Sequence, residues 1–193
     1  MPLPLVLASA SPRRLDLLRQ IGCEPARIDP ADADEASRPG ELPRAYALRV
    51  AKAKLRIVAA RHPEALVLAA DSVVAVGRRI LPKAEDEGTV RRCLALLSGR
   101  RHKVFGGVAV AASGRVRTRL VETVVGFKRL ETGEIEAYVR SGEWRGKAGG
   151  YAIQGRAAIF VSFLSGSYSN VVGLPLFETA ALLRSAGFPV GAS

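Results

Sequence analysis

Two short apolar runs, at residues 3–8 and 65–70, constrain the fold of this chain more than any other feature. Polar residues follow each run at once. Runs of about this length are typical of strands that are buried on both faces of a sheet, which helices must then cover. Helical patterns lie between and after the two runs, so we expect an α/β protein.

The remaining pattern predicts how strands and helices follow one another. A helix is expected over 11–21, because Ser11 is a preferred N-cap and Gly22 a preferred helix end. Hairpins are expected at the turns 77–79 and 113–114, so the sheet is predicted to be mixed and twisted, not purely parallel. The other expected segments are strands at 24–28 and 158–164, helices at 43–60, 86–97, 132–141 and 175–186, and loops at 146–155 and 165–173.

The size and composition of the chain fit one globular domain over residues 1–193. Hydrophobic residues make up 48% and charged residues 24%, which is ordinary for a folded protein and disfavours disorder. The apolar runs are too short to cross a bilayer, and no basic segment precedes the apolar N-terminus as it would in a signal peptide. We therefore expect a cytoplasmic protein with no membrane partner.

The cysteines and histidines show no metal-binding pattern. Cys23 and Cys93 lie far apart without CxxC spacing, so two reduced structural thiols are expected. His62 and His102 also lack the spacing of metal ligands, which makes a structural zinc site improbable.

The net charge of +11 indicates a polyanionic partner: nucleic acid, an acidic membrane or nucleotide phosphates. A generally arginine-rich composition is the plainer explanation. Basic residues are spread along the chain, and aromatic residues make up only 6%, which leaves little material for base stacking. Acidic residues, by contrast, gather within 29–41. Nucleic-acid binding is therefore not favoured.

The segment 8–14, ASASPRR, is the first candidate for chemistry. It stands where a buried strand gives way to a helix, and the N–H groups of a helix N-terminus favour anions. Arg13 and Arg14 are misplaced in a first turn, where the helix dipole is positive. A bound phosphate would resolve that conflict through the fork-like donors of arginine. Two solvated arginines on a surface helix remain the alternative.

Asp71 and Ser72 are the second candidate, because they come directly after the apolar run 65–70. Ligands of α/β proteins bind where strands end. Asp71 can therefore hold a metal ion or act as a general base on water. An Asx turn that opens the following hairpin explains the same residues equally well.

The lysines leave both functional and plain interpretations open. Lys83 can reach a phosphate, and Glu85, Asp86 or Glu87 can share a metal ion, although acids in the first turn of the next helix are simply favourable. Lys54 lies on a helix rich in lysine and arginine, so a solvated face is the default for it.

The glycine-rich segment 146–155 is the last candidate. Gly142 to Lys147 is one residue short of a P-loop and has Ala148 where Ser or Thr binds magnesium, so a P-loop is rejected. Gln154 carries an amide that can read a base edge, or it is a surface glutamine in a turn. No GxGxxG, GxSxG or HExxH signature is present, which argues against a dehydrogenase, a serine hydrolase and a zincin.

Taken together and in this order, the segments resemble the Maf family, the septum-formation inhibitor-like nucleotide pyrophosphatases. The matching stretches span almost the whole chain: LVLASASPRR, the Ala51-x-x-Lys54 helix, VLAADSVVAVGRRILPKAED, LSGRRHKV, GEWRGKAGGYAIQGRAAIFV and GSYSNVVGLPLFETAALL. The resemblance implies an elongated, two-lobed α/β domain with a deep cleft, usually a homodimer. It also implies hydrolysis of a nucleoside triphosphate between the α- and β-phosphates, with Mg²⁺ or Mn²⁺ as cofactor.

The same resemblance implies a role for individual residues. Asp71 matches the proton acceptor. The phosphate-binding positions are Ser9, Arg13, Arg14, Lys54 and Lys83. The positions linked to base choice are Arg13, Ser72 and Gln154, and the acidic positions near the metal are Glu35, Asp71 and Asp86.

The SPRR and IQG forms resemble the branch that acts on dTTP, UTP and modified pyrimidine nucleotides in a house-cleaning role. A sister branch acting on 7-methyl-GTP carries Trp after SP and Ser-Glu-Gly in place of Ile-Gln-Gly. This chain departs from the usual pattern at four positions: Ser72 for Thr, Pro82 for Gly, Ala84 for Pro and Gly106 for Thr.

Two other functions stay open. The family name is associated with septum formation, so a non-catalytic regulator of cell division that binds proteins or DNA is the main alternative. A nucleotide-dependent transferase or kinase is the other, and the missing P-loop and kinase signatures count against it.

Overall fold

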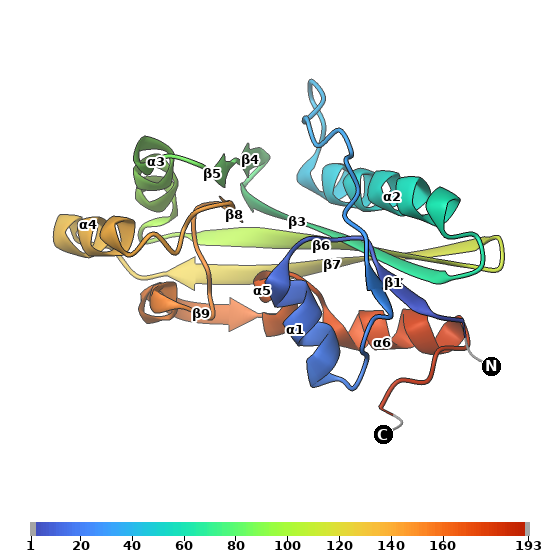
Figure 1. The fold of residues 1–193 in the computed structure, drawn as a ribbon. Coiled ribbons are helices and arrows are strands. Elements are labelled where there is room, and N and C mark those ends of the chain that lie inside the picture. Colours follow the sequence, from blue (N-terminus) through green and yellow to red (C-terminus); the bar gives the residue numbers. More distant parts are fainter. Residues whose placement is uncertain (1–2, 192–193) are drawn as a thin grey trace.

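A mixed seven-stranded sheet runs the length of the molecule in the computed structural model, which describes residues 3–191 (Figure 1). Its strand order is β2-β1-β3-β6-β7-β9, with β4 added to β3. β1 pairs in parallel with β2 and β3, and the other pairings are antiparallel. The strands are β1 (Leu5–Leu7), β2 (Arg27–Ile28), β3 (Leu66–Val76), β4 (Arg79–Leu81), β6 (Arg101–Ala112), β7 (Arg115–Phe127) and β9 (Val161–Ser165). The predicted mixed α/β fold is confirmed.

Helices cover both faces of this sheet (Figure 1). α2 (Pro43–Arg61) packs on one face, against β3 and β6. The opposite face is covered by α1 (Pro12–Gln20), α5 (Tyr168–Val172) and α6 (Leu176–Ser185). The remaining elements lie at one end of the molecule: α3 (Glu87–Leu97), α4 (Thr132–Ser141) and a small sheet of β5 (Lys83–Ala84) and β8 (Lys147–Ala148).

Successive buried side chains of β3 point alternately to the two faces of the sheet, as the two-residue period of a strand requires. Leu66 and Leu68 belong to the large cluster on the face of α1 and α6, whereas Val67 and Ala69 pack with α2. The same alternation turns neighbouring side chains of β3 to opposite faces further along the strand.

Chain reversals follow the predicted turn residues. α1 ends just before Gly22, and α4 ends at Gly142, with φ of +69° and +70° respectively. The β6–β7 turn has φ of +48° at Ser113 and +73° at Gly114, as the two central residues of a type I′ hairpin require. Positive φ angles favour glycine and a few other residues, so the residue types at these positions predicted the helix ends and the turn correctly.

Three expectations are wrong in detail. β3 does not end at residue 70 but continues to Val76, because β6 pairs with it along that whole length. The strand expected at 158–164 is a 3₁₀ turn, Arg156–Phe160, followed by β9. The loop expected at 165–173 contains α5, which Ser167 caps by accepting from the Asn170 N–H. Over residues 3–191, no helix is long and apolar enough to span a membrane.

Candidate active site

The candidate site lies where one side of β3 has no partner strand, between its pairing with β1 and its pairing with β4. β1 pairs with β3 only as far as Leu68, and β4 pairs with it only from Val74 onward. Asp71 and Ser72 lie between these limits, in the middle of β3 and not after its end as predicted. Because successive side chains alternate, Asp71 points to the α2 face and Ser72 to the α5 face. One short stretch of strand thus supplies both sides of a cleft.

On the α2 face, opposite charges form a continuous chain, which we call the carboxylate wall: Asp71, Lys54, Glu35 and Lys83. The Lys54 ammonium lies 2.8 Å from Asp71 Oδ1 and 2.7 Å from Glu35 Oε1, and Lys83 donates to the other oxygen of Glu35. Lys54 and Asp71 are only 7% and 4% exposed. The solvated-face interpretation of Lys54 is therefore wrong.

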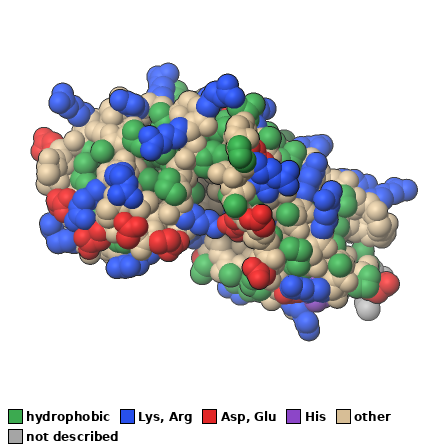
Figure 2. All heavy atoms as spheres, turned by 90° about the horizontal axis from the view of Figure 1, so that it is seen from above, with side chains coloured by type: hydrophobic (Ala, Val, Ile, Leu, Met, Phe, Trp, Pro, Cys, Tyr) green, Lys and Arg blue, Asp and Glu red, His purple; other side chains and the backbone are tan. Residues whose placement is uncertain are grey.

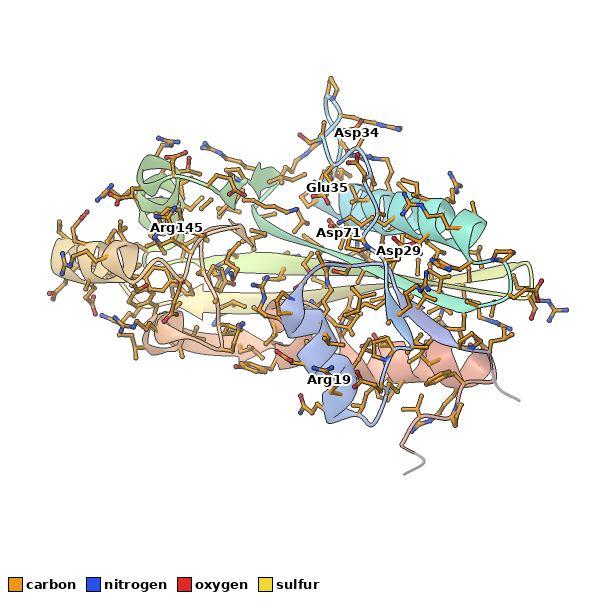
Figure 3. The ribbon with its side chains drawn as sticks, viewed as in Figure 1. Arg19, Asp29, Asp34, Glu35, Asp71 and Arg145 are labelled. Carbon is orange, nitrogen blue, oxygen red and sulfur yellow. The ribbon has the colours of Figure 1, made fainter. Side chains whose placement is uncertain are left out.

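The acidic loop after β2 brings Glu35 to this wall. The Tyr46 hydroxyl, from α2, donates to the Glu35 carbonyl at 2.7 Å, and Arg49 donates to the Ala36 carbonyl at 2.9 Å. Figure 3 shows the side chains of Glu35 and Asp71 near one another although they come from different elements. Burial alone would raise the pKa of Glu35, but the hydrogen bonds from Lys54 and Lys83 lower it to about 2. The Glu35 carboxylate is thus ionised at neutral pH.

A glycine lets α2 approach the strand at this point. Gly107 pairs with Asp71 across β3 and β6, and a Cβ added there would overlap the backbone carbonyl of Ala47 on α2. Glycine is the residue that permits so close a backbone approach. The close packing of α2 places Lys54 over Asp71.

On the α5 face, two arginines meet backbone carbonyls and hydroxyls. We call this set the arginine wall: Arg13, Arg14, Ser9, Ser72 and the carbonyls of Val172 and Gly173. Arg14 donates to the Gly173 carbonyl at 2.9 Å, to Ser9 Oγ at 3.0 Å and to Ser72 Oγ at 3.4 Å. Arg13 donates to the Val172 carbonyl at 3.2 Å. Both side chains thus turn toward the cleft and are not simply solvated.

The arginine wall carries uncompensated positive charge. Neither Arg13 nor Arg14 forms an ion pair with a carboxylate among residues 3–191. Burial, and then the neighbouring Arg14, lowers the pKa of Arg13. Burial also lowers the pKa of Arg14, against the opposing effect of Asp71 and Glu35. Two desolvated, adjacent cations are stabilised by an anion that bridges them.

The two walls enclose a cleft between them. Figure 2 shows the molecule hollowed near its middle, with cationic and acidic side chains at the rim. Of the predicted residues, the cleft brings together Arg13, Arg14, Lys54, Asp71, Ser72, Lys83 and Gln154, and Glu35 lines an adjoining hollow that shares Asp71 and Lys83.

The glycine-rich segment forms the third side of the cleft. β8 pairs Ala148 with Lys83 of β5, and Gly149 and Gly150 both adopt positive φ, of +67° and +71°. The chain then presents the exposed side chain of Gln154 to the cleft. Lys147 also lines the cleft, and burial, followed by the charge of Arg13, lowers its pKa. The sequence argument missed Lys147 because it weighed that lysine only as part of a P-loop.

Two predicted residues, Ser9 and Asp86, do not line the cleft itself. Ser9 stands behind Arg14, where its hydroxyl accepts from that guanidinium and from the Ser11 N–H at 3.2 Å. Asp86 is the N-cap of α3, and its two carboxylate oxygens accept from the N–H and the hydroxyl of Thr89, each at 2.7 Å. Asp86 does not line the cleft.

The carboxylate wall offers two carboxylates, Asp71 and Glu35, as oxygen donors toward a cation. Asp71 and Glu35 both direct an oxygen at one point, which the Lys54 ammonium occupies. Within residues 3–191, no three side chains of the kinds His, Cys, Asp and Glu gather closely enough to hold a metal ion alone. Mg²⁺ is commonly bound by one or two carboxylates together with substrate phosphates, which is the donor set available here.

These features define a class of protein: an α/β domain whose cleft is built to bind a polyanion beside a buried carboxylate. The chain belongs to the Maf family, because residues 4–186 match the family described as Maf-like protein.

Relatives with curated names match nearly the whole chain. A protein of Paramagnetospirillum magneticum is 64% identical over 185 residues, covering 95% of this chain and 97% of the relative. A protein of Caulobacter vibrioides is also 64% identical over 185 residues, covering 95% and 96%. A protein of Rhodospirillum rubrum is 64% identical over 189 residues, covering 97% and 90%. All three bear the name dTTP/UTP pyrophosphatase.

Proposed function

We propose that this chain hydrolyses dTTP and UTP to the nucleoside monophosphate and diphosphate, and that it also clears modified pyrimidine nucleotides. One observation carries the proposal: a buried carboxylate, Asp71, faces a cleft whose opposite wall presents two desolvated arginines. The names of the relatives give the same activity and bases.

The arginine wall binds the triphosphate. Arg13 and Arg14 each keep guanidinium N–H groups free to donate beyond their contacts with the α5 carbonyls. Lys83 and Lys147 add positive charge from the neighbouring strands β5 and β8. The same cations offset the negative charge of the bound triphosphate.

Asp71 is the proton acceptor for the attacking water. Its carboxylate is buried, so it is poorly solvated and held in one orientation by Lys54. A general base contributes by taking the water proton as the new bond to phosphorus forms.

Asp71 and Glu35 would hold the Mg²⁺ or Mn²⁺ ion, which polarises phosphate oxygens and offsets their charge when bound. Their carboxylates already converge on one cation, the Lys54 ammonium. Asp86 would have to release Thr89 before it joined them. Asp86 stays a proposed third acidic residue of the metal site.

Base choice rests on Arg13, Ser72 and Gln154. The Gln154 amide both donates and accepts, which matches the adjacent N–H and carbonyl on the pairing edge of thymine and uracil. Ser72 is anchored by its contact with the Gly173 carbonyl at 3.4 Å. Such polar groups reject a base that leaves them unpaired.

We also propose a cytoplasmic homodimer, on the resemblance to the family. Light scattering of the purified chain at several concentrations tests the assembly, and a monomeric mass throughout would contradict it.

Diphosphate release over a nucleotide panel tests the function. The panel contains dTTP, UTP, CTP, 5-methyl-UTP and 7-methyl-GTP, each with Mg²⁺, with Mn²⁺ and with excess chelator. We expect metal-dependent turnover of dTTP and UTP. Turnover of 7-methyl-GTP alone would keep the reaction but overturn the base assignment. No turnover by folded protein would make a non-catalytic regulator the leading function, which steeply salt-dependent binding to duplex DNA would support.

A further inference from the structure

A buried amide beneath the arginine wall has an unusual environment. Asn170, on α5, is 0% exposed. Its Nδ2 donates to the Val104 carbonyl on β6 at 3.2 Å and to Thr123 Oγ1 on β7 at 3.0 Å. Its Oδ1 is buried without a hydrogen-bond partner among the described residues. Native proteins rarely leave such an atom unpaired, so the position calls for a reason.

The unpaired oxygen points at the backbone of Gly106. A Cβ added to Gly106 would overlap Asn170 Oδ1, so the Cα–H bond of the glycine takes that direction instead. A Cα–H group is a weak donor to oxygen. The Asn170 amide therefore fits here because residue 106 has no side chain.

Thr123 completes the anchor of α5. Its hydroxyl accepts from the Ser167 N–H at 3.1 Å and from Asn170, and it donates to the Ser167 carbonyl at 3.2 Å. One donor and two acceptor sites are all that a hydroxyl offers, so this group is fully used. α5 has only five residues, too few to be held by its own hydrogen bonds. The Asn170 and Thr123 side chains tie it to the sheet.

The other end of α5 carries the contacts of the arginine wall. The carbonyls of Val172 and Gly173 accept from Arg13 and Arg14, at 3.2 Å and 2.9 Å. Any shift of α5 moves both carbonyls and thereby both guanidinium groups.

We propose that Asn170 is a positioning residue for phosphate binding, which aims Arg13 and Arg14 through the α5 carbonyls and depends on the space left by Gly106. The identity of the anion as a nucleotide triphosphate rests on the proposed function. The coupling between Asn170, Gly106 and the two arginines does not rest on the proposed function, because it follows from their contacts.

The test titrates inorganic pyrophosphate by calorimetry into four proteins: wild type, Asn170→Ala, Gly106→Ala and the double variant. We expect each single variant to weaken binding about tenfold, as loss of aligned charge-assisted hydrogen bonds implies. The double variant should be no weaker than either single one, because the added methyl then occupies the space vacated by the amide. In turnover assays the KM for dTTP should rise with kcat nearly unchanged.

Thr179→Val is the matched control. Thr179 is equally buried, and its hydroxyl also has no hydrogen-bond partner within residues 3–191. It lies on α6 and is not among the hydrogen-bond partners of Arg13 and Arg14 in that range. We expect it to bind pyrophosphate as wild type does. If Asn170→Ala fails to fold, the test uses the double variant, in which the added methyl fills the space of the amide. Its pyrophosphate binding should be weaker than that of wild type.

Wild-type affinity in Asn170→Ala or in the double variant would overturn the inference, and so would single losses that multiply in the double variant. Failure of the wild type to bind pyrophosphate would overturn it as well. A wild type that binds pyrophosphate but turns over no nucleotide would overturn the proposed function instead, while the titration still decides this inference.

Discussion

The two walls of the cleft lie on opposite faces of the same strand, but the cations of one wall are paired with carboxylates and those of the other are not. On the carboxylate wall, Lys54 and Lys83 are matched by Asp71 and Glu35. On the arginine wall, Arg13 and Arg14 meet only neutral acceptors among the described residues. A wall with balanced charges keeps its geometry without a ligand, whereas a wall of unmatched cations gains most from an incoming anion. The difference assigns chemistry to one wall and substrate binding to the other.

Two consecutive glycines underlie this arrangement. Gly107 lets α2 approach the sheet behind Asp71, and Gly106 leaves space for Asn170 behind Ser72. An added Cβ would point to the α2 face at Gly107 and to the α5 face at Gly106, so each glycine leaves space on one face only. The two walls can therefore be perturbed separately, by changes to neighbouring residues.

The largest effect is expected from substitution of Asp71, which should impair turnover by the carboxylate wall but not binding by the arginine wall. Asp71→Asn should reduce turnover of dTTP by about 10²- to 10⁴-fold, the usual contribution of a general base. Its affinity for dTTP without divalent metal should stay within about threefold, because the arginine wall is intact. Steady-state kinetics and calorimetry measure the two quantities. Asp16→Asn, on the exposed side of α1, is the matched control and should behave as wild type.

The next effect concerns pH and the buried histidine beneath the cleft. His102 is 2% exposed, donates to or accepts from the Tyr151 hydroxyl at 2.8 Å, and burial lowers its pKa to about 4. The unfolded chain therefore takes up a proton first as pH falls. Stability should be complete above a pH of about 6.5 and decline by up to about 3 kcal/mol as the pH approaches 4.

Chemical denaturation across this range measures that loss. His102→Gln, which does not titrate, should be less stable at pH 7 but should show a flatter profile between pH 6.5 and 4. A variant profile as steep as that of the wild type would mean that other groups dominate this range.

The carboxylate wall should respond in a lower pH range. Because Lys54 and Lys83 lower the pKa of Glu35 to about 2, Glu35 stabilises the fold above a pH of about 4.5, and its contribution is lost as the pH falls toward 2. Glu35→Gln should be destabilised at pH 7 and should converge with wild type near pH 2. The same denaturation series tests this, and a constant difference at all pH values would contradict it.

A smaller effect is expected from shortening the arginine fork. Arg14→Lys keeps the charge but loses the planar donors that meet Gly173, Ser9 and Ser72. The KM for dTTP should rise about tenfold, the equivalent of roughly 1.4 kcal/mol, with little change in kcat. Arg19→Lys, on the exposed surface of the same helix, should leave both constants unchanged. An equal effect of the two substitutions would argue against the arginine wall.

The smallest effect is expected at Ser72. Ser72→Thr adds a methyl group and keeps the hydroxyl that meets Gly173. The ratio of kcat/KM for dTTP and UTP should change by about fivefold, since one methyl in a pocket is worth about 1 kcal/mol at the lower end of its range. Competition between the two nucleotides in one reaction measures the ratio directly. A change to 7-methyl-GTP would contradict the role given to Gln154.

The sequence predicted those parts of the fold that depend on local conformation. Gly22, Gly142 and the turn at 113–114 marked chain reversals because their positive φ angles favour particular residues. α5 was missed because one and a half turns are too short to show a helical period.

The site was harder to predict than the fold, because long-range pairing decides it. Asp71 looked like a strand end, but β6 pairs along the whole of β3 and places it mid-strand. Lys54 looked solvated on a basic helix, and only the loop that carries Glu35 shows why it is buried. The family resemblance pointed to both residues without this geometry, and the catalytic role of Asp71 and the phosphate-binding role of Lys54 stay predictions.

The most direct test of the central claim is ³¹P NMR of dTTP during incubation with wild type and, in parallel, with Asp71→Asn. We predict that wild type with Mg²⁺ or Mn²⁺ converts dTTP to dTMP and diphosphate, and that the variant leaves it almost unchanged. Release of dTDP and phosphate, or equal conversion by both proteins, would contradict cleavage between the α- and β-phosphates by Asp71.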